Sequence, residues 1–413
     1  MFIKRIFLNS APELGFGLLL TFGSGIGQTF FISLFSGEIR NELSLSHGIF
    51  GTFYSAATLV SSVIFLWFGK FTDQFNLTLT GAITLVALSA FAILMASTHS
   101  LVILFLSLFG LRFFGQGLLG HIAISAMTRW FSKQRGRALS IALLGHTIGE
   151  AILPALVAFF LTLLTWREVW VGVSLCMAII FLPALYWVTK SVKSRELDRS
   201  QNELTDTKGI SRISWNRAQV LRDLRFYQLI PGILASPFII TGVLFHQVHL
   251  IETKSWSLKM FASCYPLFAL SAAGFSLLVG WIIDKLSAVY LLRFYLLPLG
   301  LGLILLASTD ETYTAPLFMI LMGSSTGAAT VIISALWVEL YGTEYFGSIR
   351  SMCFSMVVLS TSIAPGLMGI LIDIGVTLET QFGILAIYIF VCSIIFTIIT
   401  PSLLIPRTPP SIS

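Results

Sequence analysis

The sequence predicts an all-α membrane protein with twelve transmembrane helices in two pseudo-symmetric bundles of six, and three observations support this fold class. The chain of 413 residues is 56% hydrophobic and 11% charged, whereas a soluble domain is about 25% charged. Its apolar residues fall in continuous runs rather than in the alternating pattern of a β-barrel strand. The two halves of the chain also repeat several residues at one fixed spacing.

Twelve apolar runs are long enough to cross a bilayer core of about 30 Å as helices. They cover residues 14–36, 48–68, 77–96, 101–127, 138–164, 168–189, 227–250, 260–283, 288–308, 315–338, 348–372 and 381–405. The first run follows MFIKRIFLNS, which resembles the basic start of a signal peptide. Because this run is too long and lacks a small-residue cleavage pattern, we interpret it as an uncleaved helix.

The basic residues are distributed unevenly over the two ends of these helices. With both termini in the cytoplasm, 20 of the 25 Lys and Arg lie on the inner side, four lie on the outer side, and Arg112 lies within the membrane. This bias predicts a multi-pass protein of the inner (plasma) membrane with cytoplasmic termini. The polar stretch 191–226 then becomes a cytoplasmic linker between an N-terminal bundle, residues 1–190, and a C-terminal bundle, residues 227–413.

Several functional classes are excluded by what the sequence lacks. Four cysteines stand far apart inside apolar runs, which is neither a disulfide framework nor a zinc pattern. No HExxH or GxSxG motif and no paired Asp motif appears. We therefore expect no enzyme activity, no catalytic residue, no metal and no cofactor. The net charge of +6 is explained by the cytoplasmic face, so no nucleic-acid partner is expected. A sensor is disfavoured because the linker is too short for a signalling domain.

An internal repeat relates the two halves at an offset of 211 residues. The matched pairs are Gly69 with Gly280, Asp73 with Asp284, Gly136 with Gly347, Ser140 with Ser351, Pro154 with Pro365, and Gly172 with Gly383. The segments GKFTDQF and GWIIDKL both follow the second helix of their half. Two six-helix halves in parallel repeat, joined by a linker, are typical of transporters that bind substrate between the halves.

The plan resembles the major facilitator superfamily over nearly the whole chain. GKFTDQFN resembles the superfamily loop that begins Gly-x-x-x-Asp-Arg, with Gln74 in place of the Arg. Gly69 would allow close helix approach, and Asp73 would pair with a basic group to latch the inner side in one state. Gly280 and Asp284 are the corresponding latch residues of the second half. Within the superfamily, the stretch 129–169 resembles the monocarboxylate-transporter-like branch.

Arg112 is the principal candidate for the functional site. It lies about 17 Å from the outer end of its helix at 1.5 Å per residue, near the midplane, where an Arg costs at least about 2.5 kcal/mol. Its segment LRFFGQG also resembles the superfamily motif with Arg in the fourth helix. Two interpretations stay open: an anion-binding or proton-coupling group, and a structural Arg that binds carbonyls and hydroxyls of the first helix.

Glu150 and His146 are the candidates for proton coupling. Glu150 is expected at a depth similar to that of Arg112, and His146 precedes it by one helical turn on the same face. A buried carboxylate whose surroundings change can bind and release a proton; a static ion pair with Arg112 is the alternative. Gly145 and Gly149 resemble the Gly-x-x-x-Gly-Pro motif of superfamily antiporters, but Glu150 replaces the Pro, which argues against a drug/proton antiporter.

Four further polar residues are candidate substrate ligands with Arg112: Gln28, Tyr54, Gln116 and His246. Tyr54 belongs to a polar stripe with Thr58, and Gln116 lies one turn after Arg112. The animal members of the resembled branch bind carboxylate through a Lys in the first helix and an Asp/Arg pair in the eighth. This sequence has neither, so an anion would depend on Arg112 and His246.

These features predict a secondary active transporter that works by alternating access. The expected activity is proton-coupled movement of a small organic anion such as a monocarboxylate. The expected partners are the proton and the lipid bilayer, and the protein is expected to be a monomer. Efflux or uptake of a drug-like or siderophore-like compound by the same fold is the alternative.

Overall fold

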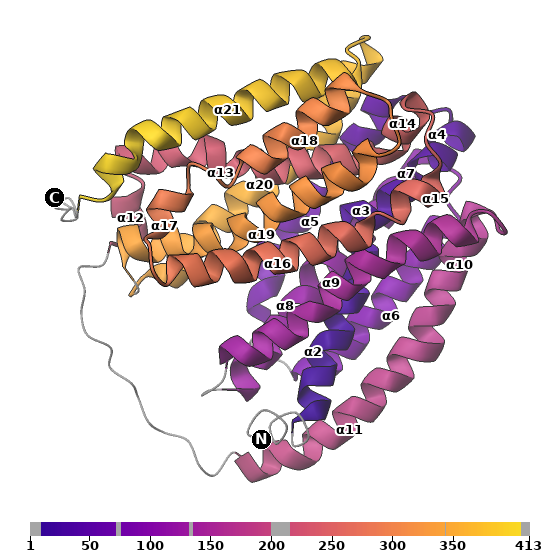
Figure 1. Ribbon diagram of the computed structural model, residues 1–413. Helices are drawn as coiled ribbons and strands as arrows, with labels where there is room; N and C mark the ends of the chain where they lie inside the picture. The colour runs from indigo at the N-terminus through magenta and orange to yellow at the C-terminus, as the bar shows by residue number, and fades with distance from the viewer. Residues whose placement is uncertain (1–9, 72–75, 132–134, 200–214, 343, 406–413) are drawn as a thin grey trace. The chain divides into compact units, whose positions relative to one another are not determined.

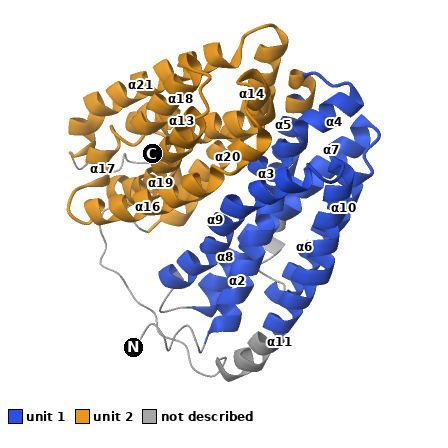
Figure 2. Cartoon of the chain, turned by 45° about the vertical axis from the view of Figure 1, so that its right-hand side comes forward, with its two compact units in different colours: residues 1–46, 52–206 blue, residues 47–51, 207–413 orange. Residues whose placement is uncertain are grey.

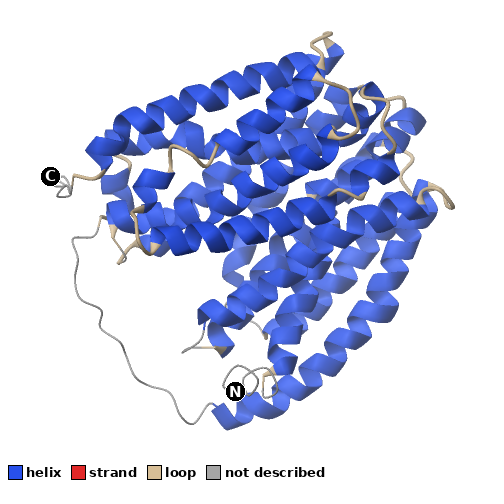
Figure 3. Cartoon of the chain, in the orientation of Figure 1, coloured by secondary structure: helices blue, strands red, loops and turns tan. Residues whose placement is uncertain are grey.

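The computed structural model describes residues 10–71, 76–131, 135–199, 215–342 and 344–405, and every regular element in this part is a helix (Figure 3). Ten of these helices are long and apolar enough to cross a membrane, and one bent pair supplies an eleventh span. A twelfth apolar run forms the short helices α17 (Ala288–Leu291) and α18 (Leu297–Ser308). The predicted all-α membrane fold is confirmed.

The chain divides into two compact units, residues 1–46 with 52–206 and residues 47–51 with 207–413 (Figure 2). The helices before residue 200 are α2 (Ala11–Ser24), η1 (Gly25–Gly27), α3 (Thr29–Ile32), η2 (Ser33–Phe35), α4 (Ser36–Leu43), α5 (His47–Phe71), α6 (Leu77–Ala96), α7 (Leu101–Gly110), η3 (Leu111–Leu119), α8 (Gly120–Trp130), α9 (Arg135–Phe160), α10 (Trp166–Cys176), η4 (Met177–Phe181) and α11 (Leu182–Arg199). The later ones, besides α17 and α18, are α12 (Arg217–Val220), α13 (Leu224–Phe245), α14 (Gln247–Thr253), α15 (Leu258–Ala262), α16 (Tyr265–Ile283), α19 (Thr314–Tyr341), α20 (Phe346–Asp373) and α21 (Leu378–Leu403) (Figure 1).

Polar residues at the helix starts explain several of the boundaries. Asn76 accepts hydrogen bonds from the backbone N–H groups of Thr78 and Leu79 at the start of α6. Thr165 forms a capping box with Glu168 at the start of α10, and Thr377 accepts from the backbone N–H of Thr380 in α21. Such caps satisfy N–H groups that have no partner within the helix.

The predicted spans 14–36 and 288–308 are interrupted in the structure. The run 14–36 bends by 49° between η1 and α3. The run 288–308, predicted as one helix, forms α17 and α18 with turns between them. Pro298 stands in the first turn of α18; because proline has no N–H and fixes φ, it begins a helix more readily than it continues one. Within the predicted linker 191–226, α11 extends to Arg199 and α12 begins at Arg217, while residues 200–214 lie outside the described part.

Small residues bring helix backbones together within each unit. In the first unit, a Cβ atom added to Gly145 of α9 would lie 2.1 Å from the carbonyl oxygen of Leu18 in α2. In the second unit, a Cβ atom on Gly327 of α19 would lie 2.1 Å from the carbonyl oxygen of Ala272 in α16. Membrane helices associate through such close contacts because burial from water does not drive them together.

Candidate functional site

The first helix is interrupted at Gln28. Its backbone is extended, with φ −85° and ψ 157°, between the last residue of η1 and the first residue of α3. An interruption of this kind leaves backbone carbonyls without partners inside the helix. Within a membrane, those carbonyls must find donors from elsewhere in the protein.

Arg112 supplies the donors on one side of this interruption. Its Nη1 donates to the carbonyl oxygen of Gly27 at 3.0 Å, and its Nε donates to the Thr58 hydroxyl at 3.2 Å. Only 2% of Arg112 is exposed. The guanidinium carbon lies 5.2 Å from the centroid of the Tyr54 ring, close enough for a cation–π contact. Arg112 therefore joins the helix that carries it to the first two helices of its unit.

Tyr54 stabilises the other side of the interruption. Its hydroxyl is hydrogen-bonded to the hydroxyl of Thr29, the first residue of α3, at 2.8 Å. Tyr54 is fully buried. Of the predicted ligands, Tyr54 and Arg112 are brought into contact, and Gln28 stands between Gly27, whose carbonyl binds Arg112, and Thr29, whose hydroxyl binds Tyr54.

A close backbone contact fixes the first helix against the π-helical segment η3, which carries both Arg112 and Gln116. A Cβ atom on Gly27 would lie 2.2 Å from the carbonyl oxygen of Leu111, 2.6 Å from the backbone nitrogen of Gln116 and 2.7 Å from the Cα of Gly115. Only glycine fits at Gly27 without moving backbone. π-Helical segments occur frequently at functional sites, and this one places Arg112 beside the interrupted helix.

Glu150 and His146 lie on α9 of the same unit, both half-buried. The His146 ring meets the Phe30 ring edge-on, with centroids 6.3 Å apart. The Arg112 side chain contacts Gly27, Thr58 and Tyr54, and in the described part of the chain no ion pair joins it to Glu150. The static ion pair weighed for these two residues is therefore not present in this structure.

His246 belongs to the second unit. It separates α13 from α14, and it is 4% exposed. Its Nε2 lies 3.0 Å from the carbonyl oxygen of Pro365 in α20. Because a carbonyl only accepts hydrogen bonds, this contact requires a proton on Nε2.

The four residues of the expected latch are only partly described. Gly69 lies in α5 and Asp73 lies outside the described residues. Gly280 lies in α16, where an added Cβ would meet a methyl group of Val331 at 3.9 Å. Asp284 is exposed at the end of α16, and within the described ranges it forms no ion pair.

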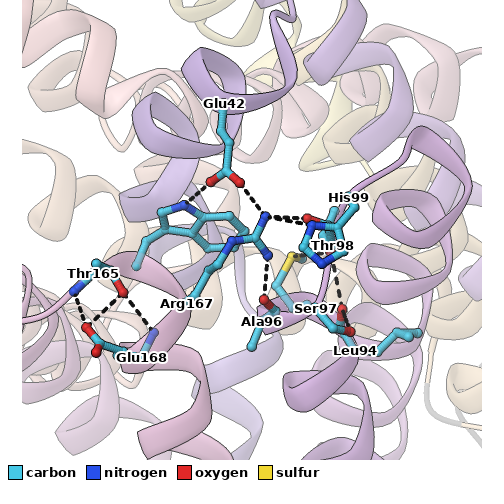
Figure 4. Close-up of polar contacts among 11 residues, drawn as sticks. Glu42, Leu94, Ala96, Ser97, Thr98, His99, Thr165, Arg167 and Glu168 are labelled. Atoms are coloured by element: carbon cyan, nitrogen blue, oxygen red, sulfur yellow. Dashed lines mark hydrogen bonds and ion pairs between the residues drawn. The ribbon is translucent and has the colours of Figure 1, made fainter.

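An ion pair that the sequence did not predict joins the end of α4 to the start of α10 in the first unit (Figure 4). Arg167, the second residue of α10, donates to Glu42 at the end of α4 at 2.5 Å and to the carbonyl oxygens of Ala96 and Thr98. The Trp166 indole N–H donates to the same carboxylate at 2.8 Å. Trp166 and Arg167 thus hold the start of α10 against the end of α4.

The second unit carries an equivalent tie with the charges reversed. Lys254, directly after α14, donates to Asp310 at 2.5 Å and lies 3.2 Å from Glu379, the second residue of α21. The Lys254 side chain is 1% exposed. Lys254 and Glu379 each lie 212 positions after their counterparts, Glu42 and Arg167.

Among the described residues, no group of three or more His, Cys, Asp or Glu side chains has the arrangement of a metal site.

Residues 17–365 match the sequence model of the Major Facilitator Superfamily. The fold and this match define the class of protein: a multi-pass membrane transporter of the secondary active, alternating-access type. The chain belongs to the Major Facilitator Superfamily.

Solved structures share the fold over nearly the whole chain. A bacterial homologue of the human lysosomal transporter Spinster, in an inward-facing and unoccupied conformation, has a TM-score of 0.73 and 16% identity, covering 97% of this chain and 99% of that one. The nucleoside transporter NupG has a TM-score of 0.72 and 14% identity, covering 93% and 98%. At these identities the likeness concerns the fold alone. Among curated protein sequences, no match was found.

Proposed function

We propose that this protein moves a small organic anion, such as a monocarboxylate, together with a proton. The observation that carries the proposal is the charge of Arg112. This cation is almost fully buried in a membrane-spanning helix, and its described contacts are a carbonyl, a hydroxyl and an aromatic ring. None of these partners carries a negative charge, and a buried cation is most stable opposite a counter-charge, so a substrate that brings a negative charge would complete the pairing.

The remaining roles complete the proposal. Gln28, Tyr54, Gln116 and His246 contribute to substrate binding with Arg112. Glu150 carries the proton, because a buried carboxylate whose surroundings change during transport can bind and release a proton. His146, one turn away, assists it. The transporter is a monomer in the inner (plasma) membrane with both termini cytoplasmic. It has no enzyme activity. The substrate class rests on Arg112, because the residues that bind carboxylate in the animal members of the resembled branch are absent from this sequence.

Gly69, Asp73, Gly280 and Asp284 form the proposed latch of the inner side. The pairwise spacing of 211 residues supports this assignment, since Gly69 precedes Gly280 and Asp73 precedes Asp284 by that number. Asp284 is exposed at the end of α16, where it is available to a basic partner when the transporter changes state.

Reconstituted proteoliposomes test the coupling. An imposed pH gradient should drive accumulation of radiolabelled lactate by the wild-type protein. Glu150→Gln should abolish this accumulation and keep the exchange of labelled for unlabelled lactate, because exchange requires no net proton movement. Glu311→Gln, at an exposed carboxylate after α18, is the matched control and should behave as the wild type. Full accumulation by Glu150→Gln would exclude this residue as the proton carrier.

Ligand-induced stabilisation tests the anion site. Small carboxylates should raise the melting temperature of purified wild-type protein, because a ligand that binds only the folded state stabilises it. Arg112→Gln should lose this response while still giving folded protein. If carboxylates have no effect and drug-like or siderophore-like compounds stabilise the protein instead, the anion assignment is wrong.

A further inference from the structure

The internal repeat places Tyr265 where the first unit has Tyr54. Tyr54 is the eighth residue of the span that begins at His47, and Tyr265 is the eighth residue of the span Leu258–Ile283. The two spans and the two tyrosines are separated by the same 211 residues as the latch motifs. Both side chains are fully buried. The second helix of each half therefore carries one buried phenol at the same level.

The two phenols also make equivalent contacts. The Tyr265 hydroxyl donates to Oε1 of Gln247 at 2.8 Å, as the Tyr54 hydroxyl is bonded to Thr29 at 2.8 Å. Gln247 is the first residue of α14 and directly follows His246. Thr29 is the first residue of α3 and directly follows Gln28. In each unit, the phenol thus bonds to the first residue of a helical segment, α3 in the first unit and α14 in the second.

The partners of the two phenols are not at repeat-equivalent positions. Gln247 lies 218 residues after Thr29, seven more than the repeat offset, which is about two turns of helix. His246, the residue between α13 and α14, also lies 218 residues after Gln28. In both units the phenol therefore bonds to the residue that follows the boundary between two helical segments.

From these contacts we infer that Tyr265 is a positioning residue for the proposed substrate site. It acts through Gln247 on His246. In the first unit, Tyr54 acts in the same way through Thr29 on Gln28. The inference rests on the proposed function. The hydroxyl of Tyr265 fixes the start of α14 through a buried hydrogen bond, and the Pro365 carbonyl fixes the adjoining His246 ring. The two contacts hold the His246 imidazole in one orientation, in which it can contact a polar group of the organic anion.

The test compares Tyr265→Phe with Tyr295→Phe. Tyr295 is a matched control because it is also a buried phenol of the second unit, and its hydroxyl donates to the Gly232 carbonyl in α13 at 3.2 Å, far along the helix from His246. Hydrogen exchange of the amides of α14 is measured in purified full-length protein. Tyr265→Phe should speed this exchange about fivefold, the factor that corresponds to one ordinary hydrogen bond, and Tyr295→Phe should leave it unchanged.

Lactate exchange in proteoliposomes provides the second measurement. Tyr265→Phe and Tyr54→Phe should each raise KM about fivefold or more and leave the maximal rate nearly unchanged. Tyr295→Phe should keep the wild-type KM. Should Tyr265→Phe not fold, Gln247→Asn breaks the same hydrogen bond from the other side and has the same expected results.

Two outcomes would overturn the inference. Unchanged exchange of the α14 amides in Tyr265→Phe means that the hydroxyl does not hold this segment. Faster exchange with an unchanged KM means that the segment does not serve the substrate. If the wild-type protein fails to exchange lactate at all, the proposed function and the substrate part of the inference fail together, and the hydrogen-exchange result still decides the positioning role.

Discussion

Replacing Gly27 by alanine should separate the first helix from η3 and release Arg112. The added Cβ atom would lie 2.2 Å from the Leu111 carbonyl oxygen and 2.7 Å from the Gly115 Cα. Both neighbours are backbone, so no side-chain rotation relieves the clash. Reaching an ordinary contact requires the two helices to move apart by about 1 Å. The same movement stretches the 3.0 Å hydrogen bond between Arg112 and Gly27 beyond bonding range.

The expected loss of stability combines two effects. Overpacking a tight contact costs about 1–3 kcal/mol. Losing a hydrogen bond from a charged donor costs about 1.5–3 kcal/mol. Together they lower the free energy of unfolding of Gly27→Ala by about 3–5 kcal/mol, since the two effects share one displacement and are not fully additive.

Denaturant unfolding of purified protein in detergent measures this loss. Gly120→Ala is the matched control on the helix that follows η3, because an added Cβ meets no atom within 4 Å there. In a helix, that change should be neutral or stabilise by up to about 1 kcal/mol. If Gly27→Ala and Gly120→Ala unfold within about 1 kcal/mol of each other, the close contact between Gly27 and η3 does not exist and the reasoning is refuted.

Two further substitutions address the other polar contacts. Thr58→Val should lower the free energy of unfolding by about 1–3 kcal/mol, because the Nε of Arg112 loses its acceptor. Thr58→Ser keeps the hydroxyl and should keep most of the stability. Equal losses of stability in both variants would exclude the hydroxyl as the cause. Lys254→Met should cost about 1–3 kcal/mol by leaving Glu379 and Asp310 together without a cation. Thermal unfolding detects this cost, and an unchanged melting temperature would show that the outer tie does not stabilise the second unit.

The prominence of Arg112 was predictable because a charge deep in a membrane span is rare and costly. Its acceptors were less predictable. The polar stripe containing Tyr54 and Thr58 indicated a polar helix face, but the interruption at Gln28 did not show in the hydropathy. Gly23, Gly25 and Gly27 come directly before Gln28, and their density favours a break, because glycine weakens a helix.

The pairing of Tyr54 with Tyr265 could be predicted from the repeat offset of 211 residues. The offset of 211 was applied to glycines, prolines and acidic residues, and the same offset applied to aromatic residues finds Tyr54 and Tyr265 at once. The outer ion pairs differ in kind. Arg167 and Lys254 were visible as outer charges, but their partners lie 125 residues away in both units, in opposite directions along the chain. Such pairs become apparent only when the helix ends are placed in space.

The reversed charges of the two outer ties have a consequence for how the protein assembles. The two halves repeat residues at a fixed spacing, and in each half the tie joins the segment after the first long helix to the start of the last one. An exchange of the last helices during membrane insertion would set Glu42 against Glu379 and Lys254 against Arg167. Both combinations repel, while each correct closure joins opposite signs. The pattern of charge signs thus favours the packing of each last helix in its own bundle over the exchanged arrangement.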